Sequence, residues 1–81
     1  MPSTTRVVRL LGSDAISEIR FDLVSKKMRL KFPKTRSVWE YDDVTITDFS
    51  AMVTSQSPGQ VFNNLIRNNY KGHRLEPPPA D

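Results

Sequence analysis

The side chains whose type and spacing most clearly suggest a chemical role in this chain of 81 residues are cations at a strand-like spacing. Lys27, Arg29 and Lys31 alternate with apolar residues, so on a β-strand all three would lie on one face. Clustered cations on an exposed sheet face can follow the phosphates of a nucleic acid. The neighbouring strand and the next turn extend this predicted patch with three more cations: Arg20, Lys34 and Arg36.

A second group of polar side chains follows the predicted second helix. It comprises Arg67, Lys71, His73 and Arg74, together with Tyr70. These residues could grip phosphates and stack a base. Alternatively, the cations complement the negative end of the helix dipole and Tyr70 closes the core. The sequence leaves both interpretations open.

Charge is unevenly distributed along the chain, although the formal net charge is only +3. Residues 1–36 carry nine Lys and Arg against three acids, whereas residues 37–55 carry four acids and no base. Such asymmetry is typical of a surface that binds a polyanion, but it also occurs on surfaces without a ligand.

Trp39 and Tyr41 are two residues apart in a strand-like run, so they lie side by side on one face. The apolar residues of the two preceding strands must face the helices, and this aromatic pair is the bulkier set of its own strand. We therefore predict that both rings join the core or its rim, with Glu40 beside the cations as a cross-strand partner. The alternative is an exposed pair that stacks bases.

Catalysis is not indicated. One histidine, no cysteine and serines mainly in predicted turns and caps provide no nucleophile–base pair. Asp42 and Asp43 are adjacent, so on a strand they would point to opposite faces and could not share a proton. We expect no enzymatic activity, no cofactor and no metal site.

The elements that must position these side chains are predicted to be strands first and helices second. Apolar and charged residues alternate over residues 19–23 and 28–32, and a third strand covers residues 38–42. Short connections favour an antiparallel meander. Residues 6–11 are apolar with basic flanks and would form either a fourth strand at the edge or a packed arm.

Two helices are predicted after residue 44. The first can be capped by Thr45 or Thr47. The second starts at Ser57-Pro58-Gly59-Gln60, which predicts an N-cap, a proline at the first helical position and a capping box, and it ends before Gly72. The apolar stripes are Ile46, Phe49, Met52 and Val53 in the first helix and Val61, Phe62, Leu65 and Ile66 in the second.

The predicted fold is therefore α+β: a three-stranded antiparallel meander, four-stranded if the N-terminal segment pairs, followed by two helices packed on one face. We divide the chain into a flexible or edge-strand arm at residues 1–12, a domain at residues 13–75 and a disordered proline-rich tail at residues 76–81. No signal peptide or membrane span is apparent, so we expect a cytoplasmic protein without a membrane partner.

Three motifs resemble the KTSC domain over about residues 13–75. They are Ser13-x-Ala15-Ile16-x-x-Ile19-x-Phe21-Asp22, then Trp39-Glu40-Tyr41 where the family has Tyr-x-Tyr, and Ser57-Pro58-Gly59-x-x-Phe62-Asn63-x-x-Ile66-Arg67. The domain is named for its place at the C-terminus of some lysyl-tRNA synthetases and also occurs alone in small bacterial and phage proteins. The resemblance implies this fold. It leaves the biochemical function open, since RNA binding has been suggested mainly from the synthetase context.

Our functional hypothesis is a small non-enzymatic module that binds RNA weakly, through the basic sheet face and the end of the second helix. The alternative is a protein-interaction module, such as a bacterial or phage accessory factor without a nucleic-acid role. The candidate RNA-binding residues are Arg20, Lys27, Arg29, Lys31, Lys34, Arg36, Arg67, Lys71 and Arg74.

Overall fold

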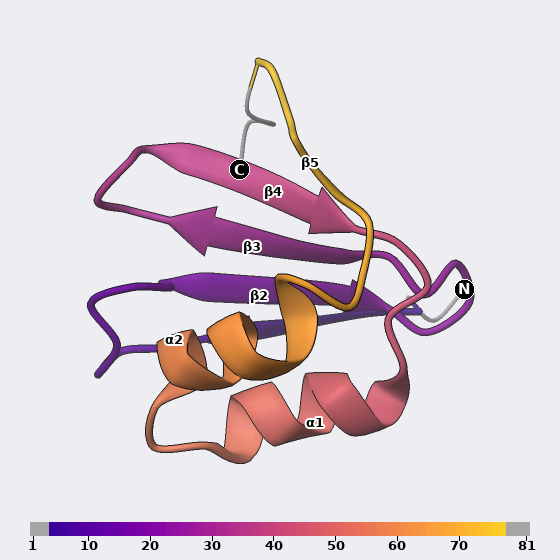
Figure 1. The fold of residues 1–81 in the computed structure, drawn as a ribbon, viewed down its shortest axis with the longest axis horizontal. Helices are drawn as coiled ribbons and strands as arrows, with labels where there is room; N and C mark the ends of the chain where they lie inside the picture. Colours follow the sequence, from indigo (N-terminus) through magenta and orange to yellow (C-terminus); the bar gives the residue numbers. More distant parts are fainter. Residues whose placement is uncertain (1–3, 78–81) are drawn as a thin grey trace.

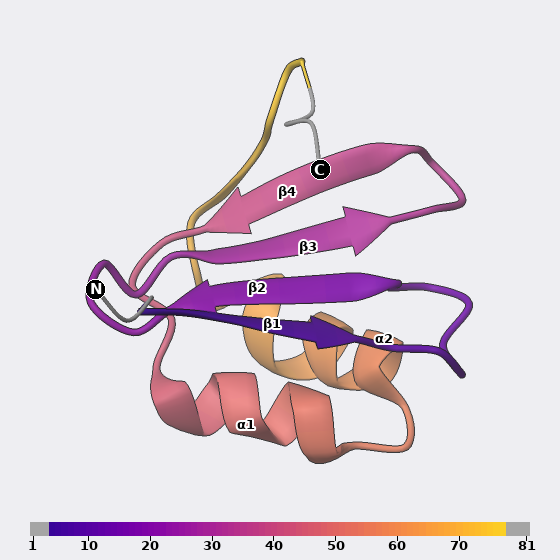
Figure 2. The same ribbon diagram turned by 180° about the vertical axis from the view of Figure 1, so that it is seen from behind.

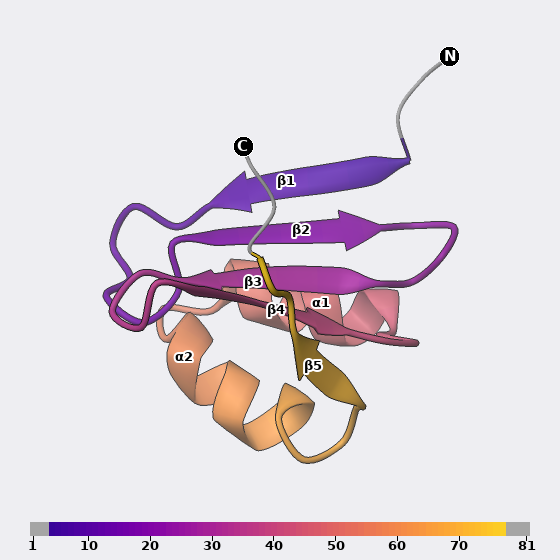
Figure 3. The same cartoon turned by 90° about the horizontal axis from the view of Figure 1, so that it is seen from above.

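The computed structural model describes residues 4–77; residues 1–3 and 78–81, and with them most of the predicted tail, lie outside the described part. Within residues 4–77, five antiparallel strands form one sheet in the order β1-β2-β3-β4-β5, and the helices lie on one side of it (Figures 1 and 3). The predicted α+β fold is confirmed. The elements are β1 (Thr5–Arg9), β2 (Glu18–Asp22), β3 (Met28–Phe32), β4 (Ser37–Tyr41), α1 (Ile46–Thr54), α2 (Pro58–Val61), the π-helical turn η1 (Phe62–Ile66) and β5 (Gly72–Arg74).

The core is an apolar layer between the sheet and the helices. Ile19 is paired with Leu30 across β2 and β3, and Leu30 is in turn paired with Trp39 of β4. Directly opposed residues share a face of the sheet, so the alternation within each strand collects the apolar side chains on the helix side. The fully buried members of this layer include Ile16, Ile19, Met28, Leu30, Val44, Met52 and Ile66.

The first helix, α1, begins as predicted with Thr45 as N-cap. The Thr45 side chain accepts a hydrogen bond of 3.2 Å from the backbone N–H of Asp48. Phe49 is buried and stacks on Phe21, with ring centroids 4.6 Å apart. The prediction that Ile46 belongs to the buried stripe is wrong, because this first helical residue is 59% exposed and the chain buries Val44 completely just before the helix.

The second helix starts with Ser57 as N-cap and Pro58 at the first helical position, as predicted. The prediction of a capping box is wrong, because the Ser57 side chain makes no cap hydrogen bond. After α2 the helix widens into η1, where the N–H of Arg67 donates to the carbonyl of Phe62 at 2.9 Å, five residues back. Ile66 is the fully buried residue of this turn.

The edge strands complete the sheet on both sides. The segment of residues 6–11 contributes β1, so the edge-strand alternative is the one observed there. At the opposite edge, β5 was not predicted, because the last predicted element was the second helix, which ends before Gly72. Gly72 lies against the ring of Tyr41 so closely that an added Cβ would be 2.2 Å from Tyr41 Cε2, so only glycine fits here without a rearrangement.

Within the described residues, no helix is long and apolar enough to cross a membrane.

Candidate nucleic-acid interface

The sheet face opposite the helices is turned toward the viewer in Figure 2. It carries four of the nine predicted residues: Arg20, Lys27, Arg29 and Lys31. We call this surface the open face and define it by the outward residues of β1 to β5. Arg20 and Arg29 are directly opposed in β2 and β3, and Glu40 of β4 is directly opposed to Arg29. The cationic side chains stay substantially in solvent, with exposed fractions of 41% for Arg20, 52% for Lys27 and 45% for Arg29. The structure therefore brings the central cations of the prediction together on one surface.

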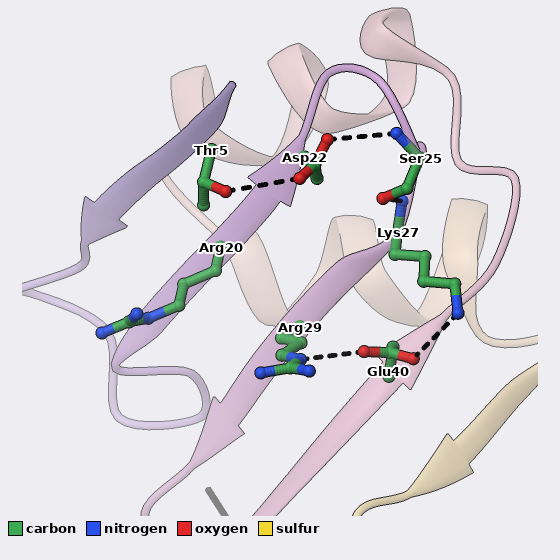
Figure 4. Close-up of a pocket in the computed structure, with 7 residues that line it drawn as sticks. All are labelled: Thr5, Arg20, Asp22, Ser25, Lys27, Arg29 and Glu40. Carbon is green, nitrogen blue, oxygen red and sulfur yellow. Dashed lines mark hydrogen bonds and ion pairs between the residues drawn. The ribbon is translucent and has the colours of Figure 1, made fainter. Parts of the chain in front are cut away.

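Glu40 is the first of two buried carboxylates beneath these cations (Figure 4). Its oxygens lie 2.8 Å from Arg29 Nε, 3.7 Å from Lys27 Nζ and 3.6 Å from His73 Nε2. Burial acts to raise the pKa of Glu40, but the hydrogen bond from Arg29 and the charges of Arg29, Lys27 and His73 outweigh it. The pKa of Glu40 consequently lies below its ordinary value of 4.5.

Glu18 is the second buried carboxylate, and sequence reasoning missed its role. Its oxygens lie 3.0 Å from Arg20 Nε, 3.6 Å from Arg9 Nε and 3.9 Å from Lys31 Nζ. The signal was present in the alternation, because Glu18 is two residues before Arg20 and therefore shares its face. Each glutamate thus contacts three basic side chains.

This layering sets the electrostatics of the open face. The side chains of Glu18 and Glu40 are only 11% and 9% exposed, whereas the cations around them extend into solvent on long aliphatic stems. An approaching ligand therefore meets positive groups first. The ion pairs also hold those groups in fixed positions before any ligand binds, which reduces the ordering cost of binding.

A shallow hollow of about 250 Å³ lies on the open face between β1 and β4 (Figure 4). Asp22 is one of the acidic residues that line the hollow. Its carboxylate accepts hydrogen bonds from two N–H groups of the adjacent turn, that of Ser25 at 3.0 Å and that of Val24 at 2.8 Å. These two bonds lower the pKa of Asp22 below its ordinary value of 3.8. The hollow is lined by Thr5, Arg20, Asp22, Ser25, Lys27, Arg29 and Glu40.

Lys34 and Arg36 lie outside the strands, in the turn that joins β3 to β4. Both are exposed, and the N–H of Arg36 donates to the carbonyl of Pro33 to close the turn. They are placed at one end of the open face, beyond the ion-paired cations.

The structure does not bring the second predicted group together. His73 and Arg74 are neighbours in β5 and point to opposite faces: His73 is opposed to Glu40, and Arg74 is opposed to Trp39 on the helix side. The Tyr70 hydroxyl donates to Asp48 Oδ2, and its ring packs against the core. Tyr70 therefore ties the end of the second helix to the start of α1, which agrees with the interpretation that Tyr70 closes the core.

Trp39 and Tyr41 both face the helix side, as the alternation predicted. Tyr41 is 5% exposed and belongs to the core, whereas Trp39 is half-buried at its rim. Burial raises the pKa of Tyr41 above 10.0, and the positive charge of Arg67 acts in the opposite direction. Among the described residues, the open face therefore offers cations without a Phe, Tyr or Trp ring to stack a base.

No group of three or more His, Cys, Asp or Glu residues within residues 4–77 has the arrangement of a metal site.

Comparison with known proteins identifies the family. A search of curated proteins found no match. Among solved structures, a KTSC domain protein from Yersinia pestis is similar with a TM-score of 0.79 and 15% sequence identity, covering 88% of this chain and 97% of that one. At this identity the likeness concerns the fold. The sequence model of the KTSC domain matches residues 12–70, and the chain therefore belongs to the KTSC domain family.

Proposed function

We propose that the chain is a small non-enzymatic module that binds single-stranded RNA weakly through the open face. The observation that carries this proposal is the layering of exposed cations over the two buried glutamates, Glu18 and Glu40. A phosphate chain approaching the sheet would meet ordered positive groups, and the acids that neutralise part of their charge would stay beneath. In such a role the protein would meet its ligand in the cytoplasm.

Weak binding follows from the charge balance. The open face carries five Lys and Arg against three acids, so the attraction for a polyanion is moderate: the cations are Arg9, Arg20, Lys27, Arg29 and Lys31, and the acids are Glu18, Asp22 and Glu40. If all five cations contact phosphates, the logarithm of the binding constant should fall against the logarithm of salt concentration with a slope of about −3.5, at about −0.7 per contact.

The test is fluorescence anisotropy of a labelled mixed-sequence RNA, titrated with the protein at several salt concentrations. Arg29→Gln is expected to weaken binding and to make the slope less steep by about 0.7, because one phosphate contact is lost. Ser50→Glu is the matched control: it also lowers the net charge by one, but it lies on the exposed part of α1, on the other side of the sheet. It should leave the slope unchanged.

Absence of RNA binding at low salt, or binding that does not respond to salt, would overturn the proposal. It would favour the alternative of a protein-interaction module, such as a bacterial or phage accessory factor that docks through the same face. A crosslinking pull-down that recovers both RNA and protein would then identify the partner class.

A further inference from the structure

A groove of about 430 Å³ lies on the helix side of the sheet, between the β3–β4 hairpin and the end of the second helix. Its volume falls within the range of about 300–1,000 Å³ that is usual for small-ligand sites. It is separate from the open face, because its strand residues point to the opposite side of the sheet. The groove is lined by Phe32, Thr35, Ser37, Trp39, Tyr41, Phe62, Arg67, Asn68 and Gly72.

The wall of the groove is a connected set of aromatic rings. Trp39 and Tyr41 are stacked with centroids 6.4 Å apart and planes inclined by 22°. Phe62 meets Tyr41 edge-on at 5.6 Å and Phe32 edge-on at 5.3 Å. Tyr41 is held in place by the backbone of Gly72, whereas Trp39 is only half-buried. One indole is therefore available at the rim of a wall that is already rigid.

The rim of the groove is cationic and polar. Arg67 and Asn68 are both exposed at the end of the second helix, and none of the lining residues within residues 4–77 carries a carboxylate. Arg74 lies on the same side of the sheet opposite Trp39, but it is paired with Glu76 at 3.1 Å, so we assign it no contact. An aromatic wall with a cation and an amide at its edge complements a flat, anionic ligand rather than a basic one.

The π-helical turn is an independent feature of the same place. Its ends are Phe62 and Arg67, joined by the hydrogen bond from the Arg67 N–H, and both residues line the groove. Turns of this kind are rare and are found frequently at functional sites. Here the widened turn combines a ring in the groove wall with a cation on its rim.

We propose that this groove binds one unpaired base of the RNA strand, stacked on Trp39, with Asn68 at the edge of the base and Arg67 at its phosphate. Stacking on aromatic rings is how single-stranded nucleic acids are held without a duplex. The inference rests on the proposed RNA binding and adds the contact that the open face lacks. A strand can pass from one surface to the other around β5, which is the sheet edge and only three residues long.

Trp39 is the only tryptophan, so its emission reports on the groove directly. The two probes are a twelve-residue oligouridylate, which has bases, and inorganic polyphosphate, which has none. We expect the oligouridylate to quench Trp39 at saturation, and polyphosphate to compete for binding without quenching. Salt-dependent binding of both without any quenching would overturn the groove site and leave the proposed function standing. Binding of neither would overturn both.

Two variants extend the test. Trp39→Leu should weaken oligouridylate binding by about 5- to 150-fold, the range for losing one base–aromatic stack, while leaving polyphosphate affinity unchanged. Because Trp39 also packs on the core, Asn68→Ala, at an exposed position, gives a second reading that does not depend on stability. Asn64→Ala is its control, because Asn64 is exposed on η1 and is not among the lining residues of the groove. Oligouridylate affinity should fall for Asn68→Ala and not for Asn64→Ala; equal affinity in both would contradict the site.

Discussion

The two faces of the sheet use the same cross-strand geometry with different partners. On the helix side, Ile19 and Leu30 are opposed and fully buried, so the pair removes apolar surface from water. On the open face, Arg29 and Glu40 are opposed in the same way, but nearly half of the Arg29 side chain stays in solvent. Apolar partners thus produce a core, and partners of opposite charge produce an ordered surface that can be altered with little loss of stability.

The largest loss of stability should come from shortening a side chain on the buried face. Leu30→Ala is expected to lower the free energy of unfolding by about 2–5 kcal/mol, because Leu30 is completely buried. Arg20→Ala on the neighbouring strand should cost about 1 kcal/mol or less, because its ion pair is partly exposed. Urea unfolding of both variants measures the difference. Similar losses of stability in both variants would contradict our view that the buried face stabilises the fold while the open face can be altered at little cost.

A smaller effect is expected where β5 supports the groove. Gly72→Ala places a Cβ against the Tyr41 ring and should cost about 1–3 kcal/mol, the range for overpacking. Gly12→Ala is the control, since nothing lies within 4 Å of its added Cβ and its φ is not positive. Unfolding curves measure the loss of stability, and the emission of Trp39 shows whether the neighbouring Tyr41 ring has moved. If the two variants were equally stable, the close approach of Gly72 would have no energetic role.

The smallest effect concerns the charge beneath the open face. The pKa of Glu40 is lowered in the folded protein, so its carboxylate adds stability above the ordinary value of 4.5 and loses this contribution as the pH falls through the lower folded value. Glu40→Gln should therefore be less stable than the natural protein at neutral pH by about 1 kcal/mol or less, and the gap should narrow as the pH falls below 4.5.

Urea unfolding at several pH values measures this gap, and Glu76→Gln is the control, since its side chain is 65% exposed. A gap for Glu40→Gln that persists in acid would show that the charge is not its cause. The same variant should bind RNA more tightly at low salt, because it removes a negative charge while keeping a hydrogen-bond acceptor for Arg29.

Features with a local period were predictable. The alternation over residues 19–23 and 28–32 predicts both strands and the side of the sheet to which each residue points, and Thr45 caps α1 as a threonine at that position should. Local motifs were less reliable where a side chain has more than one possible hydrogen-bonding arrangement. Ser57 has the right neighbours for a capping box, but its side chain makes no cap hydrogen bond.

Features that join distant segments were not predictable. Three residues are too few to show a period, so β5 had no signature, and its pairing with β4 separated His73 from Arg74. The open face was predicted as a basic stripe with Glu40 as a partner. The alternation also indicates the face on which Glu18 lies, but its contacts depend on the register that places it against Lys31. The groove depends on a widened turn that apolar spacing does not distinguish from an ordinary helix.

The class of the fold, its central strands and the separation of apolar from charged side chains follow from the order of the amino acids, because these features depend on the period of residues close together in the chain. Folding then places two glutamates beneath the cations and Trp39 at the rim of a groove. Burial and contact depend on which distant segments meet. Here they depend on the pairing of β5 with β4 and on the packing of the second helix against β4.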